Sequence, residues 1–388
     1  MKKLIGVSIL SSMLIFGQPF MALAEDVGSK TISFEDIESI ITEQNIAIRI
    51  NENERLKTHA GYSDLKRTIK DLEDDLEHLN DQRDQTDEIS QIVALSTEKR
   101  ALLDALKQLE RNQVDRPNVE AIADLQADMN DDAQILTGES LFIGYNQLKV
   151  ASSVISKSID SLQDQLTAMQ LQQSLGMVSH NSMNAMKTQL VDLQTQLEST
   201  EFQMDSLERQ LKIMLNDQES DLNIGSISVS EDFTIEDEEA DLAKAIENSY
   251  TIRLQENQIV ILQATLDRAK KDNGMSSNEY KAANYDLENA NLKLKQLKDA
   301  LKADYYNMID NIAKIQSDLR LAEQTLGDKK IALSEAQMKM GLGMISKLEL
   351  DQATTNYEVQ ENAVKTKQID LFNAKCNYEW FLKGLPQA

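Results

Sequence analysis

The chain has 388 residues, of which 65 are acidic and 40 basic, giving a formal net charge of −25. So large a negative charge argues against binding to nucleic acid and against direct adhesion to anionic lipid. The composition also excludes a disulfide scaffold, because Cys376 is the only cysteine, and it favours long helices, because there are only 3 prolines and 13 glycines.

The first 24 residues have the pattern of a secretory signal peptide. Lys2 and Lys3 precede an apolar stretch, Leu4 to Phe16, and Ala22-Leu23-Ala24 is a small-x-small cleavage site. The apolar stretch is shorter than the about 20 residues that a helix needs to cross a bilayer. We therefore expect residues 1–24 to direct export across the cytoplasmic membrane, so that the mature protein resides in the cell envelope or outside the cell.

Residues 25–216 predict a first helical unit. Apolar residues recur there at spacings of three and four, which places them in one narrow stripe along a helix and indicates coiled-coil packing. Residues 112–120, which include Pro117, predict a loop, whereas Gly138 and Gly144 fit either a local break or an ordinary helical turn. The stripe comprises Leu65, Ile69, Leu72, Leu76, Leu79, Ile155, Ile159, Leu162, Leu166, Met169, Met183, Met186, Leu190, Leu193, Leu197, Met204, Leu207, Leu211 and Met214.

An acidic linker, residues 217–240, separates this unit from a second one, residues 241–388. From Asp217 to Asp241 there are ten acidic residues and no basic one, and residues 224–229 predict a short strand or extended piece. The second unit continues the helical spacing, with a break at residues 272–277 and an end at Pro386. Its clearest stripe is Leu294, Leu297, Leu301, Tyr305, Met308, Ile312, Ile315 and Leu319.

Matching segments occur in the same order in the two units. Residues 48–53 (IRINEN) reappear as residues 252–257 (IRLQEN), and Gly176-Met177-Val178-Ser179 reappears as Gly343-Met344-Ile345-Ser346. Two matched pairs predict a tandem duplication of a long helical hairpin.

The two units differ in length between these landmarks. Arg49 to Gly176 is 127 positions and Arg253 to Gly343 is 90, so the first unit carries about 37 extra residues, by subtraction. The segment between about Asn80 and Asn130 is where we expect them, and much of it still has a helical pattern.

Each glycine tetrapeptide predicts a sharp turn between antiparallel helices. The glycines can adopt the left-handed conformation that ends one helix, and Ser179 and Ser346 can cap the next. Apolar side chains then point outward at each apex, from Met177-Val178 and from Met344-Ile345. The turns are open to two interpretations, a plain hairpin connection or a docking site for another coiled-coil tip.

Around the second turn, Gly343, Ser346, Glu349-Leu350 and Ala353 form a series of a glycine, a small polar residue, an acidic-apolar pair and an alanine. This series resembles the pattern of the TolC family of outer-membrane efflux ducts. The first copy matches less closely, since Ser182-Met183 replaces the acidic-apolar pair and Met186 stands in place of the alanine. Further matches are Tyr357, Ala363, Ala374, Tyr378, Leu382 and Gly384 in the last helix, and the unit openings at residues 32–45 and 242–248.

The resemblance implies an all-α protomer of a homotrimer. In this family, helical hairpins of the subunits line a duct and their tips meet a membrane-fusion-type adaptor, which joins an ABC or proton-driven pump. Carried over, the adaptor-docking residues are 176–179 and 343–346, and the acidic surplus would favour cations in the duct. Family members also carry strands that form a membrane β-barrel, and this sequence lacks segments of that pattern. A barrel-less duct of the Gram-positive type is therefore expected, and the alternative is a non-conducting coiled-coil scaffold of the envelope.

No residue pattern predicts an enzyme, a metal site or a cofactor. His59, His78 and His180 have no metal-site spacing, and the carboxylates of residues 71–77 are expected to be a solvated helix face. Cys376 is expected in the core of the last helix. The neighbouring aromatic residues Tyr378, Trp380 and Phe381 are expected to pack against adjacent helices.

Overall fold

The computed structural model describes residues 30–177, 179–218, 221–227 and 233–385. The expected signal peptide, Val178 and Pro386 lie outside these ranges. Among the described residues, no helix combines the length and the apolar character needed to cross a membrane.

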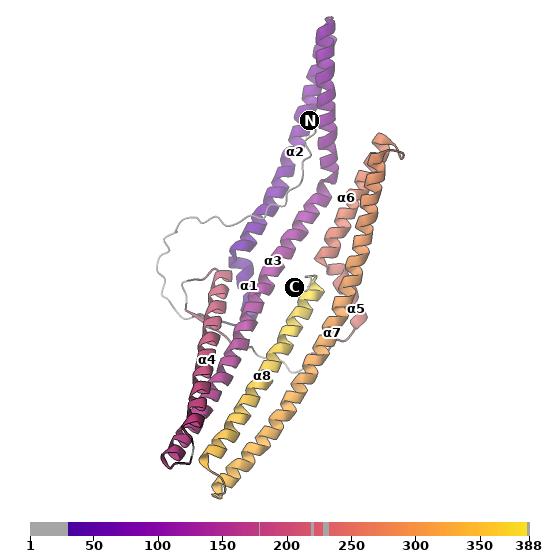
Figure 1. Ribbon diagram of the computed structural model, residues 1–388. Coiled ribbons are helices and arrows are strands. Elements are labelled where there is room, and N and C mark those ends of the chain that lie inside the picture. The colour runs from indigo at the N-terminus through magenta and orange to yellow at the C-terminus, as the bar shows by residue number, and fades with distance from the viewer. Residues whose placement is uncertain (1–29, 178, 219–220, 228–232, 386–388) are drawn as a thin grey trace.

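The described chain consists almost entirely of helices, in the same order in each half. A short helix of 11 residues is followed by three long ones, which confirms the predicted all-α fold of repeated antiparallel hairpins (Figure 1). The first half contains α1 (Phe34–Gln44), α2 (Ile46–Asp84), α3 (Ile89–Ser174) and α4 (His180–Met214). The second contains α5 (Glu238–Asn248), α6 (Tyr250–Asn273), α7 (Asn278–Gly341) and α8 (Lys347–Lys383).

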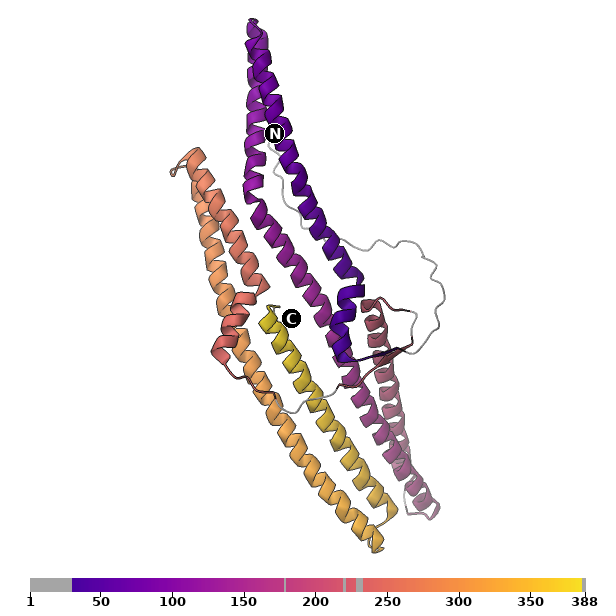
Figure 2. The same ribbon diagram turned by 180° about the vertical axis from the view of Figure 1, so that it is seen from behind.

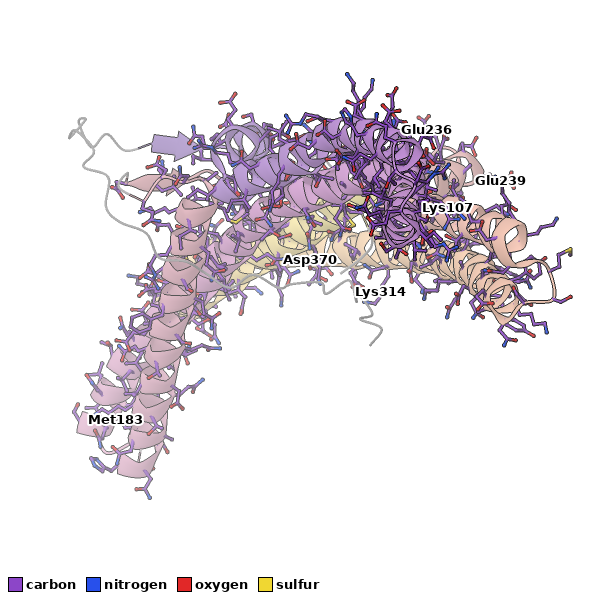
Figure 3. All side chains as sticks on the ribbon, turned by 90° about the horizontal axis from the view of Figure 1, so that it is seen from above. Lys107, Met183, Glu236, Glu239, Lys314 and Asp370 are labelled. Atoms are coloured by element: carbon purple, nitrogen blue, oxygen red, sulfur yellow. The ribbon has the colours of Figure 1, made fainter. Side chains whose placement is uncertain are left out.

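The long helices form a single layer in which α3 and α7 run the full length of their hairpins. Toward the glycine turns the neighbours follow the order α4–α3–α8–α7, and toward the other end α2–α3–α6–α7 (Figures 1 and 2). Seen from above, the arm of the layer that carries Met183 turns away from the rest, so the layer is curved (Figure 3). A curved layer of this kind has two open edges, formed by α4 and α2 on one side and by α7 on the other.

The loop predicted at residues 112–120 is wrong, because α3 continues through Pro117 without interruption. Proline removes one backbone hydrogen-bond donor from a helix. Where helices packed on both sides stabilise the segment, the proline bends the helix without ending it. Helix α3 does change direction along its length (Figure 2). Gly138 and Gly144 are ordinary helical residues of α3. At Gly138 the missing side chain lets α1 approach closely, since a Cβ there would overlap the side chain of Ile41.

The extra residues of the first half lengthen both helices of one hairpin. Helix α2 exceeds α6 by 15 residues (39 against 24) and α3 exceeds α7 by 22 (86 against 64), which together equal the predicted 37. The connection at residues 85–88 of the first hairpin corresponds to the connection at residues 274–277 of the second. The additional residues are therefore those on either side of the first connection, about 70–84 and 89–110. The predicted segment between Asn80 and Asn130 therefore includes residues 80–84 and 89–110, and it misses only residues 70–79. We call residues 70–110 the projecting end, since they extend beyond the second hairpin (Figure 1).

A two-stranded parallel sheet ties the start of the first half to the linker. Strand β1 (Lys30–Ile32) pairs with β2 (Leu222–Ile224), with Ile32 opposite Ile224. Both isoleucines are buried in a core that also contains Phe142 of α3. Of the strand or extended piece predicted at residues 224–229, only Ile224 lies in β2, and residues 228 and 229 lie outside the described ranges.

An asparagine at the end of the short helix fastens the last helix of each half. The side chain of Asn45 donates to the carbonyl of Met214 at 2.8 Å, and that of Asn248 donates to the carbonyl of Leu382 at 2.7 Å. Asn45 also caps α2, whereas in the second half Ser249 caps α6. One residue in the first half therefore performs the two roles that adjacent residues share in the second.

Candidate functional site: the glycine turns and the open edges of the layer

Both glycine turns have the backbone of a Schellman helix ending. Gly176 and Gly343 have φ values of 75° and 69°. The amide of the following methionine returns to the carbonyl five residues earlier, Met177 to Gln172 at 3.0 Å and Met344 to Lys339 at 2.9 Å. Glycine is preferred here because side chains are disfavoured at positive φ. The predicted role of these glycines in ending α3 and α7 is confirmed.

The predicted serine caps are also confirmed, but the two are unequal. Ser179 Oγ accepts a hydrogen bond from the amide of Ser182 at 3.2 Å, and Ser346 Oγ accepts one from the amide of Glu349 at 3.3 Å. Only the second turn has a full capping box, in which Glu349 Oε2 accepts from the amide of Ser346 at 2.7 Å. These bonds lower the pKa of the Glu349 carboxyl, because they favour its charged form.

Each turn carries an equivalent set of three exposed apolar side chains. Relative to the glycine they stand five residues before it, one before it and one after it, and their exposed fractions lie between 65% and 72%. Exposed apolar residues grouped at one place mark contact sites more often than scattered ones. The two sets are Leu171, Leu175 and Met177 at the first turn and Met338, Leu342 and Met344 at the second.

The structure places the expected turn residues as follows. Met177 and Met344 point into solvent as predicted, but Ile345 is half-buried, and Val178 lies outside the described residues. His180 is exposed beside the first turn, where its Nδ1 lies 3.1 Å from Nε2 of Gln173. Sequence reasoning missed the leucines and Met338, although they occupy matching positions before the two glycines.

The open edges of the layer carry exposed apolar stripes that sequence reasoning also missed. On α4, Val191, Phe202 and Ile213 recur every 11 residues, which is close to three helical turns, and all are exposed. On α7 the exposed residues lie on a face different from the buried stripe that the sequence predicts. They are Tyr285, Leu292, Tyr306, Leu321, Ile331 and Met338, and Leu342 follows directly after the helix.

A buried polar contact joins the two halves near the middle of the molecule. The indole nitrogen of Trp380 donates to Glu139 Oε2 at 2.6 Å, and Glu139 is only 7% exposed. Burial raises the pKa of the Glu139 carboxyl more than this hydrogen bond lowers it. The ammonium group of Lys383 lies 3.9 Å from the centre of the Trp380 ring. Glu139 was not singled out from the sequence, since nothing in its neighbourhood distinguishes it from the many surface carboxylates.

The remaining residues behave as helix-packing groups. Cys376 is buried, and burial raises the pKa of its thiol to about 12, which makes it unreactive. The predicted packing of the last helix is confirmed, since Tyr378, Trp380 and Phe381 are all buried. His59 bonds Asp124 at 2.8 Å between α2 and α3, a contact that the sequence did not indicate. No cluster of three or more potential metal ligands occurs in the ranges that the structure describes.

Comparison with known proteins gives matches at the level of structure. No family model matches the sequence, and no curated protein matches it. The fold superposes on CusC, from a study of its transmembrane channel formation, with a TM-score of 0.61 and 9% identity over 90% of this chain and 92% of that one. The outer-membrane channel OprN gives 0.60 and 12% identity over 90% of each chain.

A third similar structure is the open state of the Neisseria gonorrhoeae outer-membrane channel MtrE, with a TM-score of 0.55 and 12% identity over 91% of this chain and 89% of that one. All three similar proteins are channels rather than enzymes. The resemblance to the TolC family is thus confirmed for the fold, and the chain has the fold of these channel proteins.

Proposed function

We propose that the chain is the protomer of an envelope export duct that docks an adaptor protein through its two glycine turns. The observation that carries this proposal is the pairing of a channel fold along almost the whole described chain with equivalent exposed apolar sets at both turns. A turn that only connected two helices would have no need to expose three large apolar side chains, and to do so twice.

The open edges support assembly of several copies into a ring. A curved layer that exposes an apolar stripe on α4 at one edge and on α7 at the other can bury both by placing the α7 edge of one copy against the α4 edge of the next. Such head-to-tail contacts close into a ring when the rotation between copies permits. We propose a homotrimer, the state that the resemblance implies, with the substrate chosen by an ABC or proton-driven pump beyond the adaptor.

Site-specific crosslinking tests docking at the turns. Photoreactive side chains at positions 177 and 344 are expected to capture one envelope protein in living cells, identified by mass spectrometry as an adaptor with its own helical hairpin. Gln196, exposed on α4 away from the turn, is the matched control position. Capture at position 196 with none at 177 and 344 would show that the turns are not the docking sites.

The alternative function is a non-conducting scaffold of the envelope. The projecting end favours it, because a long two-helix coiled coil is a common form of spacer. Efflux of a panel of fluorescent dyes from living cells that lack the protein, compared with cells that carry it, separates the two functions, because export requires a duct and a scaffold does not supply one. Slower efflux in the absence of the protein supports the duct, and unchanged efflux of every dye supports the scaffold.

A further inference from the structure

The projecting end carries a face that no part of the described chain covers. Its helices extend about 20–30 Å past the second hairpin, given a rise of about 1.5 Å for each of the 15 and 22 additional residues. On α3, Ile89, Val93 and Leu103 are 78%, 61% and 46% exposed. They fall within one arc of the helix, together with the exposed Arg100, and we call these four residues the α3 stripe.

The α3 stripe continues the face that holds the second hairpin. One to two turns further along the same arc, Lys107 and Arg111 both bond Asp272 at the end of α6. Val114, next on that face, lines a cleft between α3 and α6. In the view from above, Lys107 lies on the side of the first hairpin that is turned toward the second (Figure 3). The stripe therefore begins where the second hairpin ends, and it faces sideways rather than toward α2.

The α2 side of the projecting end is acidic, in contrast to the mainly apolar α3 stripe. Residues 70–88 contain nine acidic and two basic residues, whereas residues 89–110 contain three of each. Five of the acidic residues lie in residues 71–77; they are exposed, and none has an ion-pair partner among the described residues. They cannot reach the stripe of their own chain, because α2 contacts α3 through the buried Leu76 and Leu79 on another side of α3.

We propose that the α3 stripe of one copy packs against the acidic α2 segment, residues 71–84, of the next copy, so that the projecting ends gather into a helical collar. The charges are complementary, since Arg100 has no ion-pair partner in the described part of its own chain and the α2 segment has an excess of carboxylates. The contact runs head to tail in the same direction as the edge contacts of the ring. This inference rests on the proposed ring, and it adds a second contact made only by the extra residues.

Crosslinking between isotopically labelled and unlabelled copies of the chain tests the contact. Oligomers assembled from ¹⁴N- and ¹⁵N-labelled protein carrying Arg100→Lys are treated with a zero-length carbodiimide, which joins amines to carboxylates in direct contact. Mass spectrometry is expected to find mixed-isotope links from the amine introduced at position 100, or from the native Lys107, to carboxylates in residues 71–84. Adding Leu103→Asp is expected to abolish these links. Adding Ala101→Asp is the matched control, because this exposed residue lies about 200° round the helix from Leu103.

Light scattering on the same oligomers measures their mass, which distinguishes failure of this inference from failure of the proposed function. A ring without mixed-isotope links in residues 71–110 overturns the collar and leaves the duct proposal standing. Links that persist in Leu103→Asp, or that join the stripe only to other segments of the same chain, also overturn the collar. A chain that remains monomeric overturns both.

Discussion

At the scale of single residues, the two glycines decide where the long helices turn. Gly176 and Gly343 have space around them on every side, so their role is purely conformational: a Cβ would meet nothing, but the positive φ would be strained. The adjacent serines then start the next helix. The turn geometry therefore follows from four residues and could be predicted from sequence, whereas the half-buried position of Ile345 could not.

Replacing Gly343 by alanine is expected to loosen the second turn without unfolding the helices. An L-residue in the left-handed conformation costs about 1–2 kcal/mol, which corresponds to about a 5- to 30-fold increase in local opening. Hydrogen exchange of the amides of residues 342–346 measures this increase. Gly341→Ala is the control, because Gly341 is the last residue of α7 and is helical. Equal exchange in the two variants would contradict the assigned backbone role.

Acidification is expected to weaken the second turn and leave the first unchanged. The folded pKa of Glu349 lies below its unfolded value, so its contribution to stability is complete above the unfolded pKa and is lost as the pH falls through the folded pKa. The first turn has Ser182 at the equivalent position and no such titration. Protection factors of the first amides of α8 and α4, compared across this pH range, test the difference. If the amides at both turns lost protection equally on acidification, the capping box would not be the cause.

At the scale of helices, the contact between Glu139 of α3 and Trp380 of α8 is a buried polar link between the halves. The folded pKa of Glu139 is raised, so the folded protein loses stability as the pH rises from the unfolded toward the folded pKa. Glu139→Gln keeps an acceptor for Trp380 and removes the charge, so it is expected to be more stable than the wild type at neutral pH. Trp380→Phe leaves the carboxylate without its donor and is expected to cost about 1–3 kcal/mol.

Urea unfolding followed by circular dichroism over a range of pH measures both variants. The Gln variant should lose the pH dependence assigned to this site, and a pH profile identical to that of the wild type would show that Glu139 is not its source.

Charged pairs hold the outer end of the second hairpin to α3. Asp272 bonds Lys107 and Arg111, which lower its pKa, and Arg268 forms a pair with Asp115 at 2.8 Å. Asp272→Asn is expected to increase hydrogen exchange in residues 270–277 at low salt, with the difference shrinking as salt screens the pairs. Asp267→Asn, at an exposed carboxylate with no ion pair among the described residues, is the control. A difference that persisted at high salt would argue for a packing defect instead.

The sequence predicts features that depend on local periodicity, and it does not predict features that depend on how the helices pack. The repeat, the buried stripes and the 37 extra residues follow from periodicity and spacing, which depend only on local chain geometry. Pro117 was misjudged because its effect depends on the helices packed beside it. The edge stripes on α4 and α7 were missed because an exposed Phe202 or Leu321 becomes informative only when the layer order shows that its helix lies at an edge.

At the scale of the whole molecule, the protomer is an open, curved layer rather than a closed domain. Helices α3, α6 and α8 have long helices on two sides, whereas α4 and α7 lie at the edges and keep exposed apolar stripes. The charge of −25 keeps such a surface soluble and opposes non-specific association. The proposed ring therefore depends on matched apolar edges, and we expect a single charge placed within them to disrupt it.

The mass of residues 25–388 by sedimentation equilibrium tests the central claim most directly. We expect the wild-type protein to sediment as a trimer and Phe202→Asp, which places a charge in the α4 edge stripe, to sediment as a monomer with unchanged helical content. Gln196→Asp should remain trimeric, because this exposed residue of the same helix lies about 120° round the helix from Phe202. A wild-type protein that is monomeric at all accessible concentrations would contradict the ring, and with it the duct.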